Sequence, residues 1–523
     1  MNFGAIIYLK PIIALLFFVN LTDSFKILGV FTHIGKSHFD VFEPYLEQLA
    51  ARGHQLTVIS HFPQKHPIPN YKDIDLRGTT IVKETINILS YTVIPQMGHI
   101  SAALILSQWG TEACEKTLEH PSVQELIKSD EKFDLLVSEM FNTDCFLAFA
   151  HKFKIPIIGF SSCVFMPWTP GRVGNPDNPA YIPIQFVFSS DKMTFSERFL
   201  NTFWYIFHHL HYPFLMDAPA HRLARQHFGE SLPPLSQLAR NTSLIFVNNH
   251  FSLNRPRPLV PGVVEVAGIH IKPAKALPKD IEDYINGAEH GVIYFNMGSM
   301  IRSDTLPDDK REAFVQAFSE LPQRVLWKWE SDAMPGQPNN VKIAKWLPQF
   351  DILNHPNVRV FLAHGGLLGT IEAVHVGVPM IGIPMYGDQG TNMKMVESAG
   401  MAVILQYNDI TKKNILKAIR TILDNPSYKE NAERTSRAFR DRPMSPMDTA
   451  IYWTEYVIRH RGAPHMRTAG ADLPLYQYLL LDVIAAVLTT MLIVIYIIYF
   501  LIRKLLSVIR GRVQAASEEK KQQ

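Results

Sequence analysis

The chain has 523 residues, of which 47% are hydrophobic and 19% charged, and it contains three cysteines. This composition is typical of a globular protein and excludes a disordered chain, a collagen-like repeat and a small disulfide scaffold. The net charge is +3, with 51 Lys and Arg against 48 Asp and Glu, so there is no basic field for phosphates and we expect no nucleic acid partner.

The N-terminus, residues 1–24, has the pattern of a secretory signal peptide. A short start that ends at Lys10 precedes an uncharged stretch from Ile12 to Leu21, and small polar residues follow up to Ser24. The stretch is too short to span a bilayer, but it suits a signal peptide. We predict cleavage near Ser24 and entry of the chain into the secretory pathway.

Residues 25–250 and 280–440 are predicted to form two lobes of the α/β class. The expected strands are 26–31, 56–60, 135–138, 156–160, 292–296, 325–329, 358–363, 379–384 and 402–405. The expected helices of the second lobe are 308–320, 367–376, 390–399 and 411–424. Apolar strands that alternate with helices indicate parallel sheets covered on both faces. We therefore predict two doubly wound, Rossmann-like lobes facing a cleft, with ligands outside the carboxyl ends of the strands.

The first lobe contains all three cysteines and a candidate glycosylation site. At most one disulfide can form among Cys114, Cys145 and Cys163, and we expect buried thiols. Asn241 begins the sequon Asn-Thr-Ser, a glycosylation acceptor in the secretory pathway. Residues 251–279 follow as a Pro-rich segment, which predicts an extended interdomain linker.

The densest group of candidate functional residues lies in the second lobe. Its members are Trp346, Gln349, His364, Gly365, Gly366, Glu372, Asp388 and Gln389. His-Gly-Gly stands between a strand and a helix, where backbone N–H groups and the positive helix end attract a diphosphate. An indole can stack on a base, and Glu372 can accept hydrogen bonds from two ribose hydroxyls. The group therefore suits a nucleoside diphosphate sugar.

A stretch near the C-terminus predicts one membrane-spanning helix, residues 478–502. From Val483 to Ile502 it carries no charge over 20 residues, which at about 1.5 Å per residue is close to the thickness of a bilayer core. Arg503 and Lys504 follow directly, which predicts a cytosolic tail and lumenal lobes.

The tail, residues 503–523, carries Lys520 and Lys521 fourth and third from the C-terminus. This placement resembles the dilysine retrieval signal of endoplasmic reticulum membrane proteins, a signal that is read by a receptor. We expect a single-pass type I protein of that membrane.

Together and in this order, the residues from 346 to 389 closely resemble the signature of UDP-glycosyltransferases, W-x-P-Q through H-G-G to E and then D-Q. The signal peptide, the linker, the single span and the dilysine tail are similar to its membrane-bound animal branch, with insect-like features. The resemblance implies a GT-B fold that binds the UDP-sugar in the second lobe and the acceptor in the first. It also implies that residues 441–477 pack back towards the first lobe.

The resemblance further implies a role for each candidate residue. Trp346 would stack on uracil, Gln349 and Glu372 would hold the ribose, Ser299 and His364 to Gly366 would hold the phosphates, and Asp388 with Gln389 would bind the sugar. Plant-type members have Asn-Ser where this chain has Leu368-Gly369, so backbone amides must serve at that point.

Transfer of a hexose to a hydroxyl requires a base that removes the acceptor proton. His38 matches the catalytic histidine of the family, and His33 is its neighbour in the same loop. The carboxylate partner of His38 is Glu139 or Asp144. We favour Glu139, which stands at the end of a strand where the family has the shorter aspartate.

We expect an inverting transfer that gives a β-glycoside and UDP and needs neither a metal nor a cofactor. Asp73 and Asp75 could form a metal-binding D-x-D motif, but a solvated loop is favoured. Glucose is the favoured sugar, with glucuronate as the alternative, and a non-catalytic UDP-sugar-binding membrane protein is the alternative from another class. A small lipophilic acceptor would suit the aromatic residues and methionines of the first lobe, which include Met97, Trp109, Phe165, Met166, Trp168 and Phe186. The sequence leaves the acceptor's identity and a homo-oligomer open.

Overall fold

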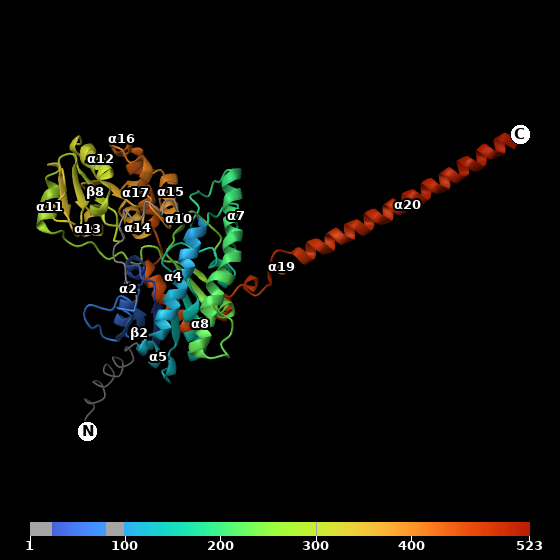
Figure 1. The fold of residues 1–523 in the computed structure, drawn as a ribbon, viewed down its shortest axis with the longest axis horizontal. Coiled ribbons are helices and arrows are strands. Elements are labelled where there is room, and N and C mark those ends of the chain that lie inside the picture. The colour runs from blue at the N-terminus through green and yellow to red at the C-terminus, as the bar shows by residue number, and fades with distance from the viewer. Residues whose placement is uncertain (1–23, 80–98, 300, 523) are drawn as a thin grey trace, which may run out of the picture. The chain divides into compact units, whose positions relative to one another are not determined.

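The computed structural model describes residues 24–79, 99–299 and 301–522. The predicted signal peptide, except Ser24, and Met97 lie outside these residues. The chain divides into two compact units, Met1–Arg467 and Thr468–Gln523. The first unit contains both predicted lobes, and the second contains the long C-terminal helix (Figure 1).

The first lobe is built on a seven-stranded parallel sheet with the order β3-β2-β1-β4-β5-β6-β7. Its strands are β1 (Lys26–Phe31), β2 (Gln55–Ser60), β3 (Tyr71–Asp75), β4 (Leu135–Glu139), β5 (Ile157–Ser161), β6 (Thr242–Val247) and β7 (Val263–Glu265). Both faces are buried because alternate side chains enter different cores. In β1, Leu28 and Val30 enter one core, and Ile27 and Phe31 enter the other.

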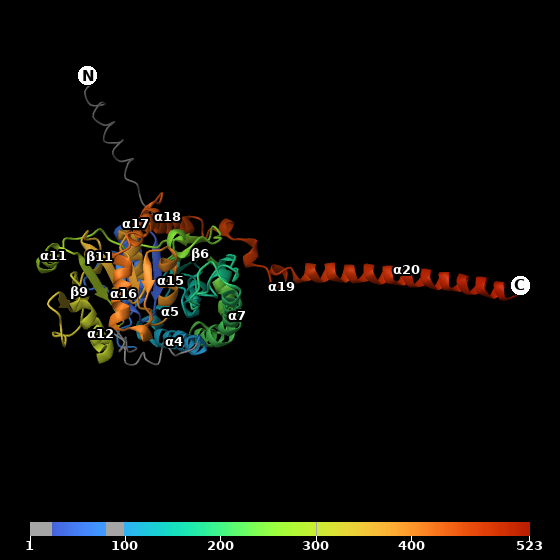
Figure 2. The same ribbon diagram turned by 90° about the horizontal axis from the view of Figure 1, so that it is seen from above.

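Helices cover both faces of this sheet. One face is covered by α4 (His99–Glu119), α5 (Pro121–Lys128), α6 (Ala148–Phe153), α8 (Ala218–Phe228) and α9 (Leu235–Arg240). The other face is covered by α2 (Lys36–Ala51) and α18 (Pro446–Arg459). The hydroxyls of Tyr45 on α2 and Thr454 on α18 lie 2.7 Å apart. The segment after the second lobe thus returns to the first, and Figure 2 shows α18 next to β6.

The second lobe has a six-stranded parallel sheet with the order β10-β9-β8-β11-β12-β13, the doubly wound order of a Rossmann fold. Its strands are β8 (Val292–Asn296), β9 (Arg324–Lys328), β10 (Val341–Ala344), β11 (Val358–Ala363), β12 (Met380–Gly382) and β13 (Ala402–Ile404). Its helices are α11 (Lys279–Asn286), α12 (Asp308–Ser319), α13 (Gln349–Leu353), α14 (Leu367–Val376), α15 (Gln389–Ser398), α16 (Lys412–Leu423) and α17 (Ser427–Arg440).

One apolar core joins the two lobes. Phe361 and Met380 of the second sheet belong to the same buried cluster as Cys163, Met166 and Trp168 of the first lobe. Burial of apolar surface stabilises such a contact by about 25 cal/mol per Å². The cluster therefore holds the two lobes together.

Two expectations about loops need correction. The predicted linker, 251–279, contains the short helix α10 (Phe251–Asn254) and the strand β7, which pairs in parallel with β6. Asp73 and Asp75 lie on β3 and not in a solvated loop, and the Asp75 carboxylate accepts hydrogen bonds from the Arg77 guanidinium. Both segments pair with a neighbouring strand. The prolines of the first segment and the charges of the second are unusual in strands, so neither strand was predicted.

The expectation of buried thiols holds for one of the three cysteines, and the other two form the single disulfide that their number allows. Cys114 on α4 and Cys145 after β4 form a disulfide, and only Cys163 is a free, buried thiol. The sequence could not reveal this pair, because the two cysteines are 31 residues apart and meet only when α4 packs on the sheet.

Removing the disulfide is expected to destabilise the chain by about 3–4 kcal/mol, because the bond closes a loop of 31 residues. Urea unfolding of the full chain in detergent micelles measures this loss in the double variant Cys114→Ala/Cys145→Ala. A reductant should lower the stability of the wild type to that of the variant and leave the variant unchanged. Equal stability of wild type and variant without reductant would contradict the prediction.

The second unit contains α19 (Leu475–Tyr478) and α20 (Leu481–Gln522). α20 is long and apolar enough to cross a membrane, with a mean hydropathy of 2.6 in its most apolar window. It begins three residues after the predicted start at Tyr478, because Leu480 has a φ of 55° that breaks the helix. The predicted tail, 503–523, continues the same helix as far as Gln522.

Candidate functional site

The candidate residues gather where each sheet reverses its strand order. In the first sheet β1 and β4 are neighbours at this point, and His38 and Glu139 lie at their carboxyl ends. In the second sheet β8 and β11 are neighbours, and they lead to Ser299 and His364. Connections diverge on either side of such a point and leave a crevice, which is where open α/β sheets bind ligands.

His38 and Glu139 form a close pair where β1 and β4 end. The Nδ1–H of His38 donates to Glu139 Oε1 at 2.6 Å. The Ser162 hydroxyl donates to the same oxygen at 2.7 Å and lies 2.8 Å from His38 Nδ1. The His38 side chain keeps 22% of its surface exposed, whereas Glu139 keeps 6%. With Nδ1 protonated, the Nε2 atom of neutral His38 carries the lone pair that a base requires.

His33 supports the His38 ring without adding charge. The two rings lie 4.1 Å apart between centroids, and Phe141 contacts both edge-on. Burial, together with His38 and His61, holds the pKa of His33 well below its ordinary value. His33 is therefore neutral at physiological pH and leaves the pairing of His38 with Glu139 undisturbed.

Asp144, the alternative partner of His38, lies in a different polar cluster. Its carboxylate accepts from Arg172 Nη2 at 2.7 Å and from the Tyr212 hydroxyl. All three side chains are buried, and burial with the nearby Asp144 carboxylate raises the pKa of Tyr212. This cluster ties the start of the segment after β4 to α7 (Phe195–Tyr212).

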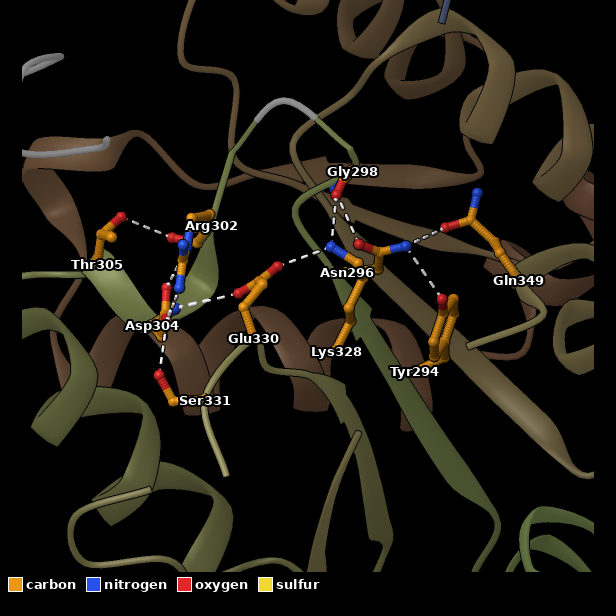
Figure 3. A network of polar contacts seen from close by, with 10 residues as sticks. All are labelled: Tyr294, Asn296, Gly298, Arg302, Asp304, Thr305, Lys328, Glu330, Ser331 and Gln349. Atoms are coloured by element: carbon orange, nitrogen blue, oxygen red, sulfur yellow. Dashed lines mark hydrogen bonds and ion pairs between the residues drawn. The ribbon is translucent and has the colours of Figure 1, made fainter. Parts of the chain in front are cut away.

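In the second lobe, Gln349 and Glu372 are held in one hydrogen-bonded chain. Gln349 Nε2 donates to Glu372 Oε2, and Asn296 Nδ2 donates to Gln349 Oε1, both at 2.7 Å. Figure 3 shows Asn296 between Gln349, Tyr294 and the backbone of Gly298. Asn296, which the sequence analysis did not single out, therefore joins the predicted ribose residues to the loop after β8.

Trp346 lies three residues before Gln349 in the sequence, and 76% of its surface is exposed. The next residue, Leu347, is 3% exposed and anchors the segment in the core. An exposed indole on an anchored segment offers a flat surface on which a base can stack.

Glu372 is a carboxylate in an apolar setting. Burial raises its pKa to about 7, although the hydrogen bond from Gln349 acts in the opposite direction. His270, from the segment between the lobes, approaches Glu372 Oε1 to 3.8 Å. Burial lowers the pKa of His270 to about 4, so this imidazole brings no positive charge to Glu372. The Glu372 carboxylate can therefore accept further hydrogen bonds from hydroxyl groups.

The predicted phosphate loop fits tightly around His364. A Cβ atom at Gly298 would lie 2.5 Å from His364 Cε1, and one at Gly366 would lie 2.5 Å from His364 Nε2. Burial, and to a lesser extent Lys328, lowers the pKa of His364 to about 4. The ring is therefore neutral and sits between two glycine backbones at the N-terminus of α14, whose first turn has no acidic residue.

The Gly366→Ala variant is expected to weaken UDP binding about tenfold or more, because the new methyl group displaces the His364 ring. Position 366 has a φ of −60°, so alanine adds volume and no backbone strain. Quenching of Trp346 fluorescence by UDP measures the affinity. Gly171→Ala is the control, because nothing lies within 4 Å of a Cβ atom there. Equal affinity in wild type and Gly366→Ala would refute the packing argument.

Lys328 and Glu330 extend the phosphate loop beyond the predicted residues. Lys328 Nζ donates to the Gly298 carbonyl at 3.0 Å and to Glu330 Oε1 at 2.7 Å (Figure 3). Ser299, the predicted phosphate contact, follows Gly298 and is exposed. Lys328 was not predicted, although it ends the strand β9 and the predicted site residues also follow strand ends.

Asp388 and Gln389 lie at the start of α15. Asn392 Nδ2 donates to Asp388 Oδ2 at 2.9 Å and to the Gly365 carbonyl at 3.1 Å, which joins the predicted sugar and phosphate residues. Burial raises the pKa of Asp388, and Asn392 and the charge of His38 act in the opposite direction. Gln389 Oε1 accepts from two backbone N–H groups of the preceding loop, at 2.8 and 3.1 Å. His38 of the first lobe therefore acts electrostatically on Asp388 of the second.

The other predicted residues lie away from this group. Asn241 is exposed at the end of α9. Phe165, Met166 and Trp168 are buried in the core, while 42% of Trp109 is exposed. Across residues 24–79, 99–299 and 301–522, no three or more His, Cys, Asp or Glu side chains cluster so that they could hold a metal ion.

Two solved structures with a similar architecture are described as glycosyltransferases. The calicheamicin glycosyltransferase CalG4 superposes with a TM-score of 0.56 at 16% identity, covering 84% of this chain and 99% of that chain. A UDP-glucose: anthocyanidin 3-O-glucosyltransferase in complex with UDP gives a TM-score of 0.55 at 16% identity, covering 83% and 98%. The predicted GT-B fold with two Rossmann-like lobes is therefore confirmed.

Sequence comparison gives the family. Residues 70–515 match the family model described as UDP-glucoronosyl and UDP-glucosyl transferase. UDP-glycosyltransferase UGT5 of the insect Dactylopius coccus is 46% identical over 493 residues, covering 92% of both chains. UDP-glucuronosyltransferase 1A7 of Rattus norvegicus is 34% identical and covers 74% of this chain and 72% of its own. The chain belongs to the UDP-glycosyltransferase family, and it is an enzyme that transfers a sugar from a UDP-sugar.

Proposed function

We propose that the enzyme transfers glucose from UDP-glucose to the hydroxyl of a small lipophilic acceptor, with inversion at the anomeric carbon. The hydrogen-bonded pair of His38 and Glu139 is the observation that carries the proposal, and the charge of this histidine acts to lower the pKa of Asp388 in the second lobe. It supports a base on the acceptor side and hydrogen-bonding groups on the donor side of one reaction centre.

The proposed reaction is a single displacement. The acceptor O–H proton moves to His38 Nε2 while the acceptor oxygen forms a bond to the anomeric carbon. The bond from that carbon to the β-phosphate oxygen breaks, and UDP leaves with the electron pair. Glu139 stabilises the imidazolium that forms, as expected for a carboxylate bound to Nδ1. Attack opposite the leaving group converts an α-linked donor into a β-glycoside.

Residues of the second lobe would bind the donor. Trp346 stacks on uracil, and Glu372 with Gln349 accepts and donates hydrogen bonds at the ribose. His364 and the backbone from Gly365 to the start of α14 bind the diphosphate. A helix N-terminus carries about half a positive charge, so we propose that no metal ion is needed for binding. Activity that EDTA abolishes would contradict that part of the proposal.

Glucose is preferred to glucuronate for two reasons. UDP-glucosyltransferase 2 of Dactylopius coccus is 44% identical over 92% of this chain. A uronate would also bring another carboxylate close to Asp388 and Glu139, and like charges in a partly buried site repel strongly. UDP-glucuronate is therefore expected to be the poorer donor.

We further propose that the enzyme is anchored in the endoplasmic reticulum membrane by α20, with its lobes in the lumen. The apolar window of α20 and the positive residues that follow it support this orientation. Anchoring would keep the enzyme at a membrane in which lipophilic compounds dissolve.

One assay tests the donor, the acceptor class and the catalytic status together. Microsomes that contain the full chain receive UDP-glucose or UDP-glucuronate with a mixed set of phenols and steroids, and UDP release is measured. We expect acceptor-dependent release with kcat/KM at least tenfold higher for UDP-glucose. A higher value for UDP-glucuronate would overturn the choice of sugar, and no release with either donor would favour a non-catalytic binding protein.

A further inference from the structure

Ser162 completes a triangle of hydrogen bonds with the proposed base and its carboxylate. It lies directly after β5 and is 4% exposed. Its hydroxyl lies 2.7 Å from Glu139 Oε1 and 2.8 Å from His38 Nδ1, while these two atoms are 2.6 Å apart. One hydroxyl therefore contacts both members of the pair.

The triangle differs from the Ser-His-carboxylate triad of hydrolases. In that triad the serine binds Nε2 and the carboxylate binds Nδ1, so the histidine can take the serine proton. Here Ser162 and Glu139 share the same Nδ1 atom of His38. His38 cannot activate Ser162 from that side, and Nε2 stays available for the acceptor proton.

The backbone of Ser162 is fixed by the neighbouring strand. Asn248, directly after β6, donates from Nδ2 to the Ser162 carbonyl at 2.9 Å and from its backbone N–H to the Ser161 carbonyl at 3.1 Å. The Asn248 side chain is fully buried. The hydroxyl therefore projects from a rigid support, as precise positioning requires.

The fixed Ser162 hydroxyl restrains the long side chain of Glu139. Glutamate has one more rotatable bond than aspartate, so its carboxylate samples more positions and loses more entropy when it is fixed. A second donor on Oε1 restricts the carboxylate to the position that receives the His38 Nδ1–H.

We propose that Ser162 is a positioning residue that fixes the Glu139 carboxylate and the Nδ1–H tautomer of His38 for proton transfer. The proposal rests on the proposed function, since it assumes that His38 is the base. Ser162 contacts neither a reacting atom nor Nε2, and it acts through its two partners.

The Ser162→Ala variant tests the proposal in the full chain. We expect kcat to fall about tenfold, as for the loss of one hydrogen bond to a charged group, while the KM for UDP-glucose stays within twofold. The acid limb of the kcat/KM profile should move to lower pH, because a Glu139 carboxylate that is no longer held in place stabilises protonated His38 less. Ser162→Thr keeps the hydroxyl and should restore most of kcat.

Ser161→Ala is the matched control, because Ser161 is a buried neighbour whose hydroxyl lies near the Val164 carbonyl and Cys163 Sγ. It should leave kcat and the pH profile unchanged. An unchanged kcat in Ser162→Ala, or an equal loss in Ser162→Thr and Ser161→Ala, would overturn the proposal in favour of simple packing.

A second measurement separates this proposal from the proposed function. The pH dependence of His38 labelling by diethylpyrocarbonate, read by mass spectrometry of the His38 peptide, needs no turnover. A labelling midpoint that moves to lower pH in Ser162→Ala supports the triangle even if no donor is turned over. An unmoved midpoint contradicts it, whatever the activity of the wild type.

Discussion

Replacing His38 by alanine is expected to lower kcat by about 10²- to 10⁴-fold, the range that a general base contributes. The acceptor hydroxyl then has no base within reach, whereas the donor-binding residues of the second lobe are untouched. Affinity for UDP, measured by quenching of the exposed Trp346, should stay within about twofold of the wild type. This separation of kcat from donor binding would identify His38 as catalytic.

The same measurements on two carboxylates distinguish the candidate partners. Glu139→Gln keeps the size of the side chain but removes the charge that stabilises the imidazolium, so kcat should fall at least tenfold without loss of UDP binding. Asp144→Asn breaks a buried ion pair with Arg172 and should destabilise the protein by roughly 3–5 kcal/mol. The folded fraction of Asp144→Asn should keep a nearly normal kcat.

Three outcomes would contradict this assignment. His38→Ala with near-normal turnover would exclude His38 as the base. Asp144→Asn with a normal stability but a large loss of kcat would return Asp144 to the catalytic centre. Loss of UDP binding in His38→Ala would show that the first lobe supports the donor site, and kcat would then no longer report on proton removal alone.

The sequence predicted the second lobe well because its strands are near-continuous apolar runs. β8 and β11 have the predicted bounds, and α14 occupies 367–376 as expected. Edge elements such as β3 were not predicted, because an edge strand needs only one buried face. Three of the five residues of β3 are charged, and Ile74 is its single buried side chain.

Candidate residues could be predicted where they directly follow an apolar strand. They were harder to predict where tertiary packing determines which partner the side chain contacts. Glu139 and Asp144 lie five residues apart in the sequence, and only the course of the chain after β4 directs the first to His38 and the second to Arg172. Ser162 and Asn296 also end or follow strands, but serine and asparagine are too common there to be singled out. Their partners come from segments distant in sequence.

The charge of Glu372 is expected to favour the proposed function and to lower the stability of the fold. A rise of its pKa from 4.5 to about 7 on folding corresponds to roughly 3 kcal/mol. Between these two values the folded chain holds a proton that the unfolded chain has lost. Stability therefore falls as pH rises from about 4.5 to 7, and the full loss remains above pH 7.

Glu372→Gln removes this titration and keeps a side chain that can bond to Gln349. At pH 8 the variant should be more stable than the wild type by roughly 3 kcal/mol, and the difference should vanish towards pH 4.5. Glu312→Gln is the matched control, because Glu312 also accepts from a glutamine, Gln316, but on an exposed helix face. It should change stability little at either pH.

The same substitution should weaken UDP binding by about 10- to 100-fold at pH 8, because hydrogen bonds from the ribose hydroxyls to a charged acceptor are lost. In the wild type, affinity should fall as pH drops below about 7 and Glu372 becomes protonated, whereas Glu372→Gln should show a much flatter profile. A variant that gains stability and keeps full affinity would mean that Glu372 is buried for another reason. A variant that loses both stability and UDP affinity would mean that the carboxylate is structural. Only a gain in stability together with a loss of UDP affinity fits a ribose-binding group.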